Sequence, residues 1–177
     1  MLGDMNVLAL AGSLRAASIN AAFCCAAARL APPGLTVLPY AGLGALPLFN
    51  PDLEAPLPQA VREFRDAVAR ADALLIASPE YAHGISGVMK NALDWLVSCE
   101  DFVGKRVAVV NTSPRAHHAD EALCEVLRTM SATLVSDASV AIPLLAHCVS
   151  EAQMVGTPEI AAQIRAVLVS LQADSAS

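Results

Sequence analysis

The 177-residue chain lacks the features that mark membrane proteins and nucleic-acid-binding proteins. No apolar run approaches the roughly 20 residues that cross a bilayer, and much of the 55% hydrophobic content is alanine. Eleven basic residues against 17 acidic ones leave a net charge of −6, whereas binding to nucleic-acid phosphates needs a basic face. We therefore expect no membrane partner and no nucleic-acid partner.

The chain also lacks the cysteine spacing of a zinc site or of a disulfide framework. Its five cysteines are odd in number and scattered, and none belongs to a CxxC pair. Free thiols suit a reducing compartment. The opening MLGDMN has an acid and no basic stretch, so we expect no secretory signal and a cytoplasmic location. From the cysteine spacing we expect no bound metal.

Apolar strands and amphipathic helices alternate along the whole sequence. We predict strands at 6–11, 35–39, 73–77, 106–110 and within 133–142. Helices are predicted at 18–30, 59–70, 85–96, 120–130 and 158–171. Residues 41–58, rich in glycine and proline, read as one long ordered loop.

This alternation predicts an α/β fold, a three-layer sandwich with helices on both faces of a five-stranded parallel sheet. A GxGxxG fingerprint is missing, so the flavodoxin-like strand order 2-1-3-4-5 is favoured over a dinucleotide-binding fold. We expect a single domain over residues 1–177, with a disordered tail at 173–177. In this order the loops after the first and third strands meet in one crevice, at the point where the strand order reverses.

The loop after the first strand carries the groups that bind a phosphate monoester. Gly12 permits a sharp exit from the strand, the hydroxyls of Ser13 and Ser18 can donate hydrogen bonds, and Arg15 supplies a permanent charge. The following helix directs its free N–H groups and positive dipole end at the same place. The candidate phosphate-binding residues are Ser13, Arg15, Ser18, Ile19 and Asn20. Taken singly, Ser18 is equally readable as a helix N-cap and Ser13 as a turn residue.

The loop after the third strand begins Ser78-Pro79-Glu80-Tyr81 and leads into a helix. A nucleophile elbow, G-x-S-x-G, is excluded here because Val88 stands where the last glycine is required. For Glu80 and Tyr81 the alternative to ligand binding is a helix-entry turn. Adjacent histidines at 117 and 118 are read as solvated loop residues, because neighbouring side chains diverge and no third metal ligand is evident.

Together, GSLRxxSxN at 12–20 and SPEY at 78–81 resemble the NAD(P)H-dependent FMN reductase family, which includes quinone, chromate and azo-dye reductases. The resemblance implies that FMN is held with its phosphate in the first loop. It also implies that the flavin ring lies along the second loop, mainly against backbone groups, and that Ser113 borders the ribityl chain or the ring. The implied ring-binding residues are Pro79, Glu80, Tyr81, Ala82, His83 and Gly84.

The sequence departs from the family at two places. The family often has Asn-Tyr after SPEY, where this chain has Ala82-His83. After the fourth strand the family has a glycine-rich loop, whereas this chain has no glycine between Gly104 and Gly156. These departures leave side-chain contacts at the ring edge, and contacts of the loop at 111–118, open.

The implied function is an FMN-dependent oxidoreductase that passes electrons from NADH or NADPH to a small acceptor by a ping-pong mechanism. Because the cofactor carries the redox chemistry, no catalytic side chain is required. The alternatives are a specialised quinone or chromate reductase, a non-catalytic flavin protein that transfers electrons or senses redox state, and a scaffold that has lost flavin.

The helix at 85–96 carries apolar residues over an arc wider than one face needs. Deep burial in its own domain explains such an arc, and so does a second partner. The family commonly dimerises through this region, so we expect a homodimer or a dimer of dimers assembled through Val88, Ala92 and Trp95.

Overall fold

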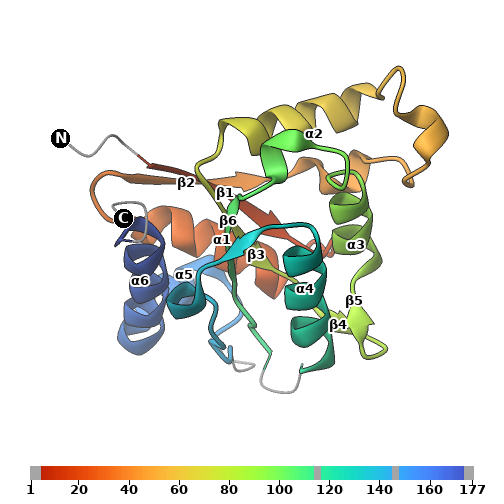
Figure 1. Ribbon diagram of the computed structural model, residues 1–177. Coiled ribbons are helices and arrows are strands. Elements are labelled where there is room, and N and C mark those ends of the chain that lie inside the picture. Colours follow the sequence, from red (N-terminus) through yellow and green to blue (C-terminus); the bar gives the residue numbers. More distant parts are fainter. Residues whose placement is uncertain (1–4, 114–116, 145–147, 174–177) are drawn as a thin grey trace.

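The computed structural model of the protein describes residues 5–113, 117–144 and 148–173. Its main sheet has five parallel strands (Figure 1). In spatial order they are β2 (Leu35–Tyr40), β1 (Met5–Ala11), β3 (Ala73–Ala77), β6 (Arg106–Val109) and β7 (Thr133–Leu134). The strands β4 (Glu80–Tyr81) and β5 (Gly84–Ile85) form a separate antiparallel hairpin. When only the five strands of the main sheet are counted along the chain, their order is the predicted 2-1-3-4-5.

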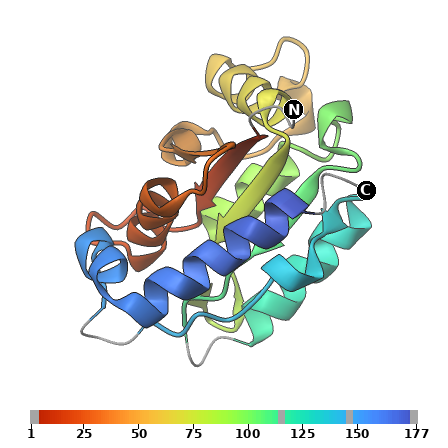
Figure 2. The ribbon, with the colours of Figure 1, turned by 90° about the vertical axis from the view of Figure 1, so that its left-hand side faces the viewer.

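Helices cover both faces of the sheet, which confirms the predicted three layers. On one face pack α1 (Ile19–Leu30), α5 (Glu151–Gly156) and α6 (Pro158–Ala173), with α6 lying across the front in Figure 2. On the other face pack α2 (Gln59–Arg70), α3 (Gly87–Asp94) and α4 (His118–Thr129). Along β1, Val7 and Ala9 face the first group while Leu8 and Leu10 face the second, as expected for a strand buried on both sides.

Several elements differ from the sequence prediction, beginning with the hairpin β4–β5, which was not predicted. The last strand lies within the predicted range 133–142 but spans only two residues, and beyond it the ladder continues as one bridge between Asn111 and Ala141. The short helix α5 was not predicted. The tail predicted as disordered begins one residue too early, since Ala173 ends α6; residues 174–177 lie outside the described residues. None of the described helices is both long and apolar enough to span a bilayer.

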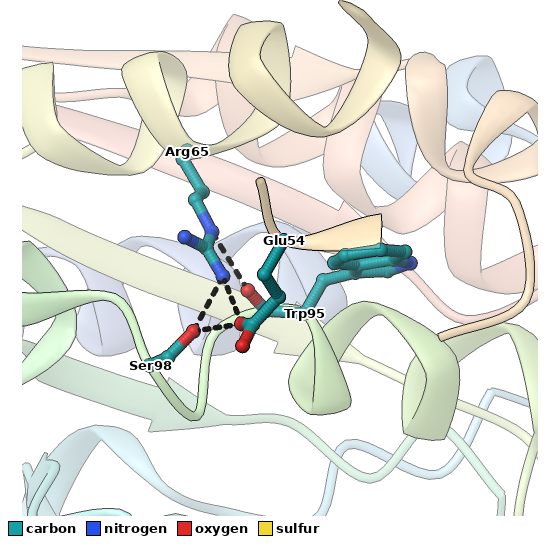
Figure 3. Close-up of polar contacts among 4 residues, drawn as sticks. All are labelled: Glu54, Arg65, Trp95 and Ser98. Atoms are coloured by element: carbon teal, nitrogen blue, oxygen red, sulfur yellow. Dashed lines mark hydrogen bonds and ion pairs between the residues drawn. The ribbon is translucent and has the colours of Figure 1, made fainter. Parts of the chain in front are cut away.

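The long loop at 41–58 is held by polar contacts from two helices. Arg65 of α2 donates from Nε to the Trp95 carbonyl (2.9 Å) and from Nη2 to Ser98 Oγ (2.8 Å). The same Nη2 donates to Glu54 Oε1 (3.2 Å), which also accepts from Ser98 Oγ (Figure 3). Nearer the start of the loop, the N–H of Phe49 donates to Oδ1 of Asn91 on α3 (2.8 Å). The loop is therefore an ordered part of the domain, as predicted.

The loop also corrects the predicted dimer surface. Ala92 and Trp95 are completely buried, so neither is available to a second copy. The indole Nε1 of Trp95 donates to the Pro47 carbonyl (2.8 Å), and its ring meets Phe49 edge-on at 5.0 Å. The wide apolar arc of α3 arises because the sheet covers one side of the helix and the chain's own loop covers another.

A close approach joins the ends of β1 and β3 at the predicted switch point. The N–H of Gly12 donates to the Ala77 carbonyl (2.9 Å), and a Cβ at position 12 would lie 2.3 Å from Ser78 Oγ and 2.9 Å from Ser86 Oγ. Ser86 in turn caps α3 by accepting from the N–H of Met89 (3.2 Å). Glycine is required here by contact distance, since nothing wider than a hydrogen atom fits.

We expect Gly12→Ala to lower the free energy of unfolding by about 1–3 kcal/mol, the usual cost of overpacking. Gly156→Ala is the matched control, because a Cβ there would meet no atom within 4 Å. Denaturant titration of the two variants measures both effects. An equal stability of the two variants would contradict the requirement for glycine at position 12.

Candidate functional site

The loops that follow β1, β3 and β6 enclose a cavity of about 250 Å³ at the carboxyl edge of the sheet. The ends of parallel strands form the ligand-binding edge of an open α/β sheet. The lining residues are Ser13, Arg15, Ala17, Ser18, Ile19, Asn20, Pro79, Glu80, Tyr81, Thr112, Ser113 and Leu144. The two loops selected from the sequence therefore share one cavity.

The first loop presents positive charge and hydrogen-bond donors to this cavity. Arg15 is exposed, and within residues 5–113, 117–144 and 148–173 its side chain has no hydrogen-bond or ion-pair partner. Ser18 is the N-cap of α1 and accepts from the N–H of Ala21 (3.1 Å). The first turn of α1 contains no acidic residue, so no side-chain charge there offsets the positive end of the helix dipole.

Ser18 thus fulfils the capping role that was the alternative interpretation, and it also lines the cavity. The two roles are compatible. The oxygen accepts from the helix N–H, while a hydroxyl retains its own proton for donation.

Asn20 fixes the geometry between the first and third loops. Its Oδ1 accepts from Thr112 Oγ1 at 2.8 Å, and both residues are buried. The contact joins the first turn of α1 to the segment after β6, two regions 92 positions apart in the sequence. The sequence analysis selected Asn20 and Ser113 but not Thr112, Ala17 or Leu144. Tertiary contact brings Thr112 and Leu144 to the cavity, whereas Ala17 lies there because it belongs to the same loop as Arg15 and Ser18.

The second loop forms the opposite wall through Pro79, Glu80 and Tyr81. Tyr81 pairs with Gly84 in the β4–β5 hairpin, which lies beside α4 (Figure 1). The other predicted ring-binding residues, Ala82, His83 and Gly84, lie in the turn and in β5, outside the lining set. The structure therefore brings together the loop after β1 and the first half of the hairpin.

Glu80 turns its carboxylate toward the start of α4. Oε2 accepts from the N–H of Ala119 (2.9 Å), and Oε1 lies 3.3 Å from Nδ1 of His83. The Ala119 N–H lowers the pKa of Glu80 most, with smaller contributions from the charges of His118 and His83, and partial burial opposes them. The carboxylate is therefore ionised at neutral pH.

The third loop contributes Ser113 to the lining of the cavity. The next three residues, 114–116, lie outside the described residues. His118 is the first residue of α4, and its ring meets that of His83 edge-on at 4.6 Å. No group of three potential metal ligands comes together among the residues that the structure describes.

The donor set fits a phosphate monoester attached to a planar ring. The guanidinium of Arg15, which has no partner within the part of the chain that the structure describes, borders the cavity together with the hydroxyls of Ser13 and Ser18 and the start of α1, and such groups bind phosphate. The first half of the hairpin supplies another part of the cavity wall. The fold and the site together define a flavodoxin-like protein with a candidate phosphate-binding cavity.

Residues 5–146 match the model of the NADPH-dependent FMN reductase family, and the chain belongs to this family. It is 41% identical over 116 residues to an NAD(P)H-dependent FMN reductase of Pseudomonas aeruginosa, an alignment that covers 64% of this chain and 62% of that protein. It is 40% identical over 112 residues to a 2-hydroxy-1,4-benzoquinone reductase of Burkholderia sp., covering 62% of this chain and 61% of that protein. These alignments span about three fifths of each relative.

Among solved structures, the fold resembles the flavoenzyme FerB, an NAD(P)H:(acceptor) oxidoreductase from Paracoccus denitrificans. The TM-score is 0.80 at 27% identity, and the superposition covers 96% of this chain and 98% of that one. An NADH:FMN oxidoreductase structure has a TM-score of 0.61 at 20% identity, covers 94% of this chain and 89% of that one, and supports the fold alone.

We expect Arg15→Ala to raise the Kd for FMN about ten- to a hundredfold, because a charge-assisted hydrogen bond contributes about 1.5–3 kcal/mol. Riboflavin, which lacks the phosphate, should bind wild type and variant alike. Arg62→Ala is the matched control, since Arg62 is exposed on α2 and does not line the cavity. Fluorescence titration of the apoprotein measures all these affinities. An equal loss of affinity for riboflavin would show that Arg15 does not act on the phosphate.

Proposed function

We propose that the protein is an FMN-dependent oxidoreductase that takes electrons from NADH or NADPH and delivers them to a small acceptor of the quinone class. One observation carries this proposal: Arg15, on a helix-opening loop and without a side-chain partner among the described residues, lines the same cavity as Pro79, Glu80 and Tyr81. Family membership and relatives named as FMN and quinone reductases support it.

In this proposal Arg15, Ser13, Ser18 and the start of α1 hold the phosphate, and the segment from Pro79 to Tyr81 flanks the ring. Bound FMN supplies the hydride and electron chemistry. The chain's own contribution is to bind and orient the ligand and to leave one side of it accessible. Tyr81 lines the cavity and is still 53% exposed, so a nicotinamide and an acceptor can use the same opening in turn. This arrangement favours ping-pong kinetics.

The lining also separates an enzyme from a simple electron carrier. Electron-carrying flavoproteins usually sandwich the ring between aromatic side chains. Among the described lining residues only Tyr81 is aromatic. One face of the ring would therefore stay free for substrate, which favours the enzyme over the carrier.

The first test is the identity and reactivity of the bound ligand. Heat-released ligand should have the mass of FMN, and anaerobic stopped-flow mixing with NADH or NADPH should bleach the flavin absorbance. Adding a benzoquinone should then restore the oxidised spectrum. FAD at full occupancy would overturn the assignment of FMN. Bound FMN that neither nicotinamide nucleotide reduces would point to the non-catalytic alternative.

We also propose that the protein forms a homodimer, through the outer face of α3 and not through Ala92 and Trp95. Leu48 is 83% exposed beside this face, where it borders a groove with Gly87, Lys90 and Asp94. Lys90 Nζ and Asp94 Oδ1 are 2.6 Å apart on the same helix. In a two-fold antiparallel packing, each lysine would also face the aspartate of the other copy, so the charge pattern is self-complementary.

We expect wild type to sediment at about twice the chain mass of 18.3 kDa and Leu48→Glu to shift it toward the monomer, because a charge buried without a partner is costly. Val169→Glu is the matched control, since Val169 is 51% exposed on α6, on the opposite face of the sheet. Both variants should keep the wild-type circular dichroism spectrum. A monomeric wild type, or a dimer that only Val169→Glu disrupts, would contradict this interface.

The proposed site of action is the cytoplasm. All five cysteines are unpaired, and Cys24, Cys99 and Cys148 are buried. Free thiols of this kind suit a reducing compartment.

A further inference from the structure

The turn of the β4–β5 hairpin has a backbone conformation that its residues do not favour. Ala82 and His83 both have positive φ, 50° and 59°. Two-residue hairpin turns with positive φ at both positions usually contain asparagine, aspartate or glycine. For an alanine, the left-handed conformation reduces the population of the turn by roughly tenfold relative to glycine. Interactions elsewhere must therefore hold the hairpin in place.

Glu80 supplies that hold. Its side chain is only 13% exposed, whereas the His83 side chain is 78% exposed, so the carboxylate is the enclosed partner. Oε2 binds the N–H of Ala119 on α4, and Oε1 faces Nδ1 of His83 within the turn. One carboxylate thus connects the hairpin to a separate helix, and the edge-on pair of His83 and His118 lies beside it.

The helix gains from the same contact. The N-cap residue of α4, His117, has no side-chain capping hydrogen bond. Glu80 satisfies an N–H in the first turn and places a negative charge at the positive end of the helix dipole. Capping from a neighbouring element ties the position of the hairpin to the position of α4.

We propose that Glu80 is a positioning residue, whose carboxylate clasps the strained β4–β5 hairpin to the N-terminus of α4 and so sets the cavity wall at Pro79–Tyr81. The inference rests on the proposed function, since the wall is taken to flank the flavin ring. Each carboxylate oxygen has a partner within the protein, Ala119 N–H for Oε2 and His83 Nδ1 for Oε1. In this proposal Glu80 acts on the ligand through the backbone that it holds.

The test is a double-mutant cycle between Glu80 and the strained turn. In the wild-type background, Glu80→Ala should raise the Kd for FMN about tenfold, a loss within the range of one charge-assisted hydrogen bond. In the Ala82→Gly background, where the turn needs less support, the same substitution should raise the Kd about threefold or less. Glu80→Gln, which keeps an oxygen acceptor for the Ala119 N–H, should be intermediate.

Two further measurements distinguish positioning from other roles of Glu80. Riboflavin affinity should fall as much as FMN affinity, because the wall flanks the ring; Arg15→Ala should affect FMN alone. Once saturated with FMN, the Glu80→Ala protein should be reduced by NADH or NADPH more slowly than wild type, because the displaced wall misaligns the ring, but by less than the factor of about a hundred or more that an acid–base role is typically worth. Equal losses in both turn backgrounds, or a hundredfold slower reduction, would overturn the proposal.

A control separates the hairpin from helix capping. Adding His117→Asp to Glu80→Ala provides α4 with a capping carboxylate of its own, and should restore thermal stability without restoring flavin affinity. Restored flavin affinity would show that Glu80 acts only as a helix cap, and would overturn the proposal.

Hydrogen exchange keeps the inference separate from the proposed function. In the apoprotein, Glu80→Ala should speed amide exchange in the segment 80–85, and less so in the Ala82→Gly background. Unchanged exchange would overturn the clasp whether or not the protein binds FMN. Failure of wild type to bind FMN, with the exchange result intact, would overturn the proposed function and its flavin-positioning consequence but not the clasp.

Discussion

The contact of Gly12 with Ser78 and Ser86 is the constraint on which the site depends. At this point the first strand, the third strand and the start of α3 meet within a distance that excludes even a methyl group. The two polar loops diverge from this junction, one toward α1 and the other toward the hairpin. Ser78 and Ser86 do not themselves line the cavity, and their contact with Gly12 fixes the point from which the two loops diverge.

The surroundings of the cavity suit a rigid binding site. The sheet beneath it is buried by two hydrophobic layers. The buried hydrogen bond between Thr112 and Asn20 joins two of the segments that line the cavity. Among the described residues, the buried polar side chains are those of Ser18, Asn20, Ser86 and Thr112, in the loops and helix starts that follow the strands. Because Ser18, Asn20 and Thr112 are buried within a scaffold that is closely packed on both sides, these three side chains need little reorganisation when a ligand enters.

Much of this architecture follows from patterns within single segments of sequence. Continuous apolar strands, helical periodicity and the polar residues at 12–20 were enough to predict the strand order and one wall of the cavity. Other features depend on partners far away in the chain. Trp95 looked like an interface residue because the loop that buries it, around Pro47 and Phe49, has no periodic signal. The hairpin was missed because Ala82-His83 lacks the usual turn residues. The helix α5 was also missed, although the capping box formed by Ser150 and Gln153 at its start was a readable signal.

The helix α3 links two surfaces that the sequence treats as unrelated. Its first turn is anchored to the cavity edge through Ser86, and its outer face carries Lys90 and Asp94 beside the exposed Leu48. If a ligand favours one placement of this helix and a second copy favours another, the two binding equilibria are energetically coupled, and the coupling is the same in both directions. Subunit concentration would then act on flavin occupancy, and flavin occupancy on assembly, through one rigid element.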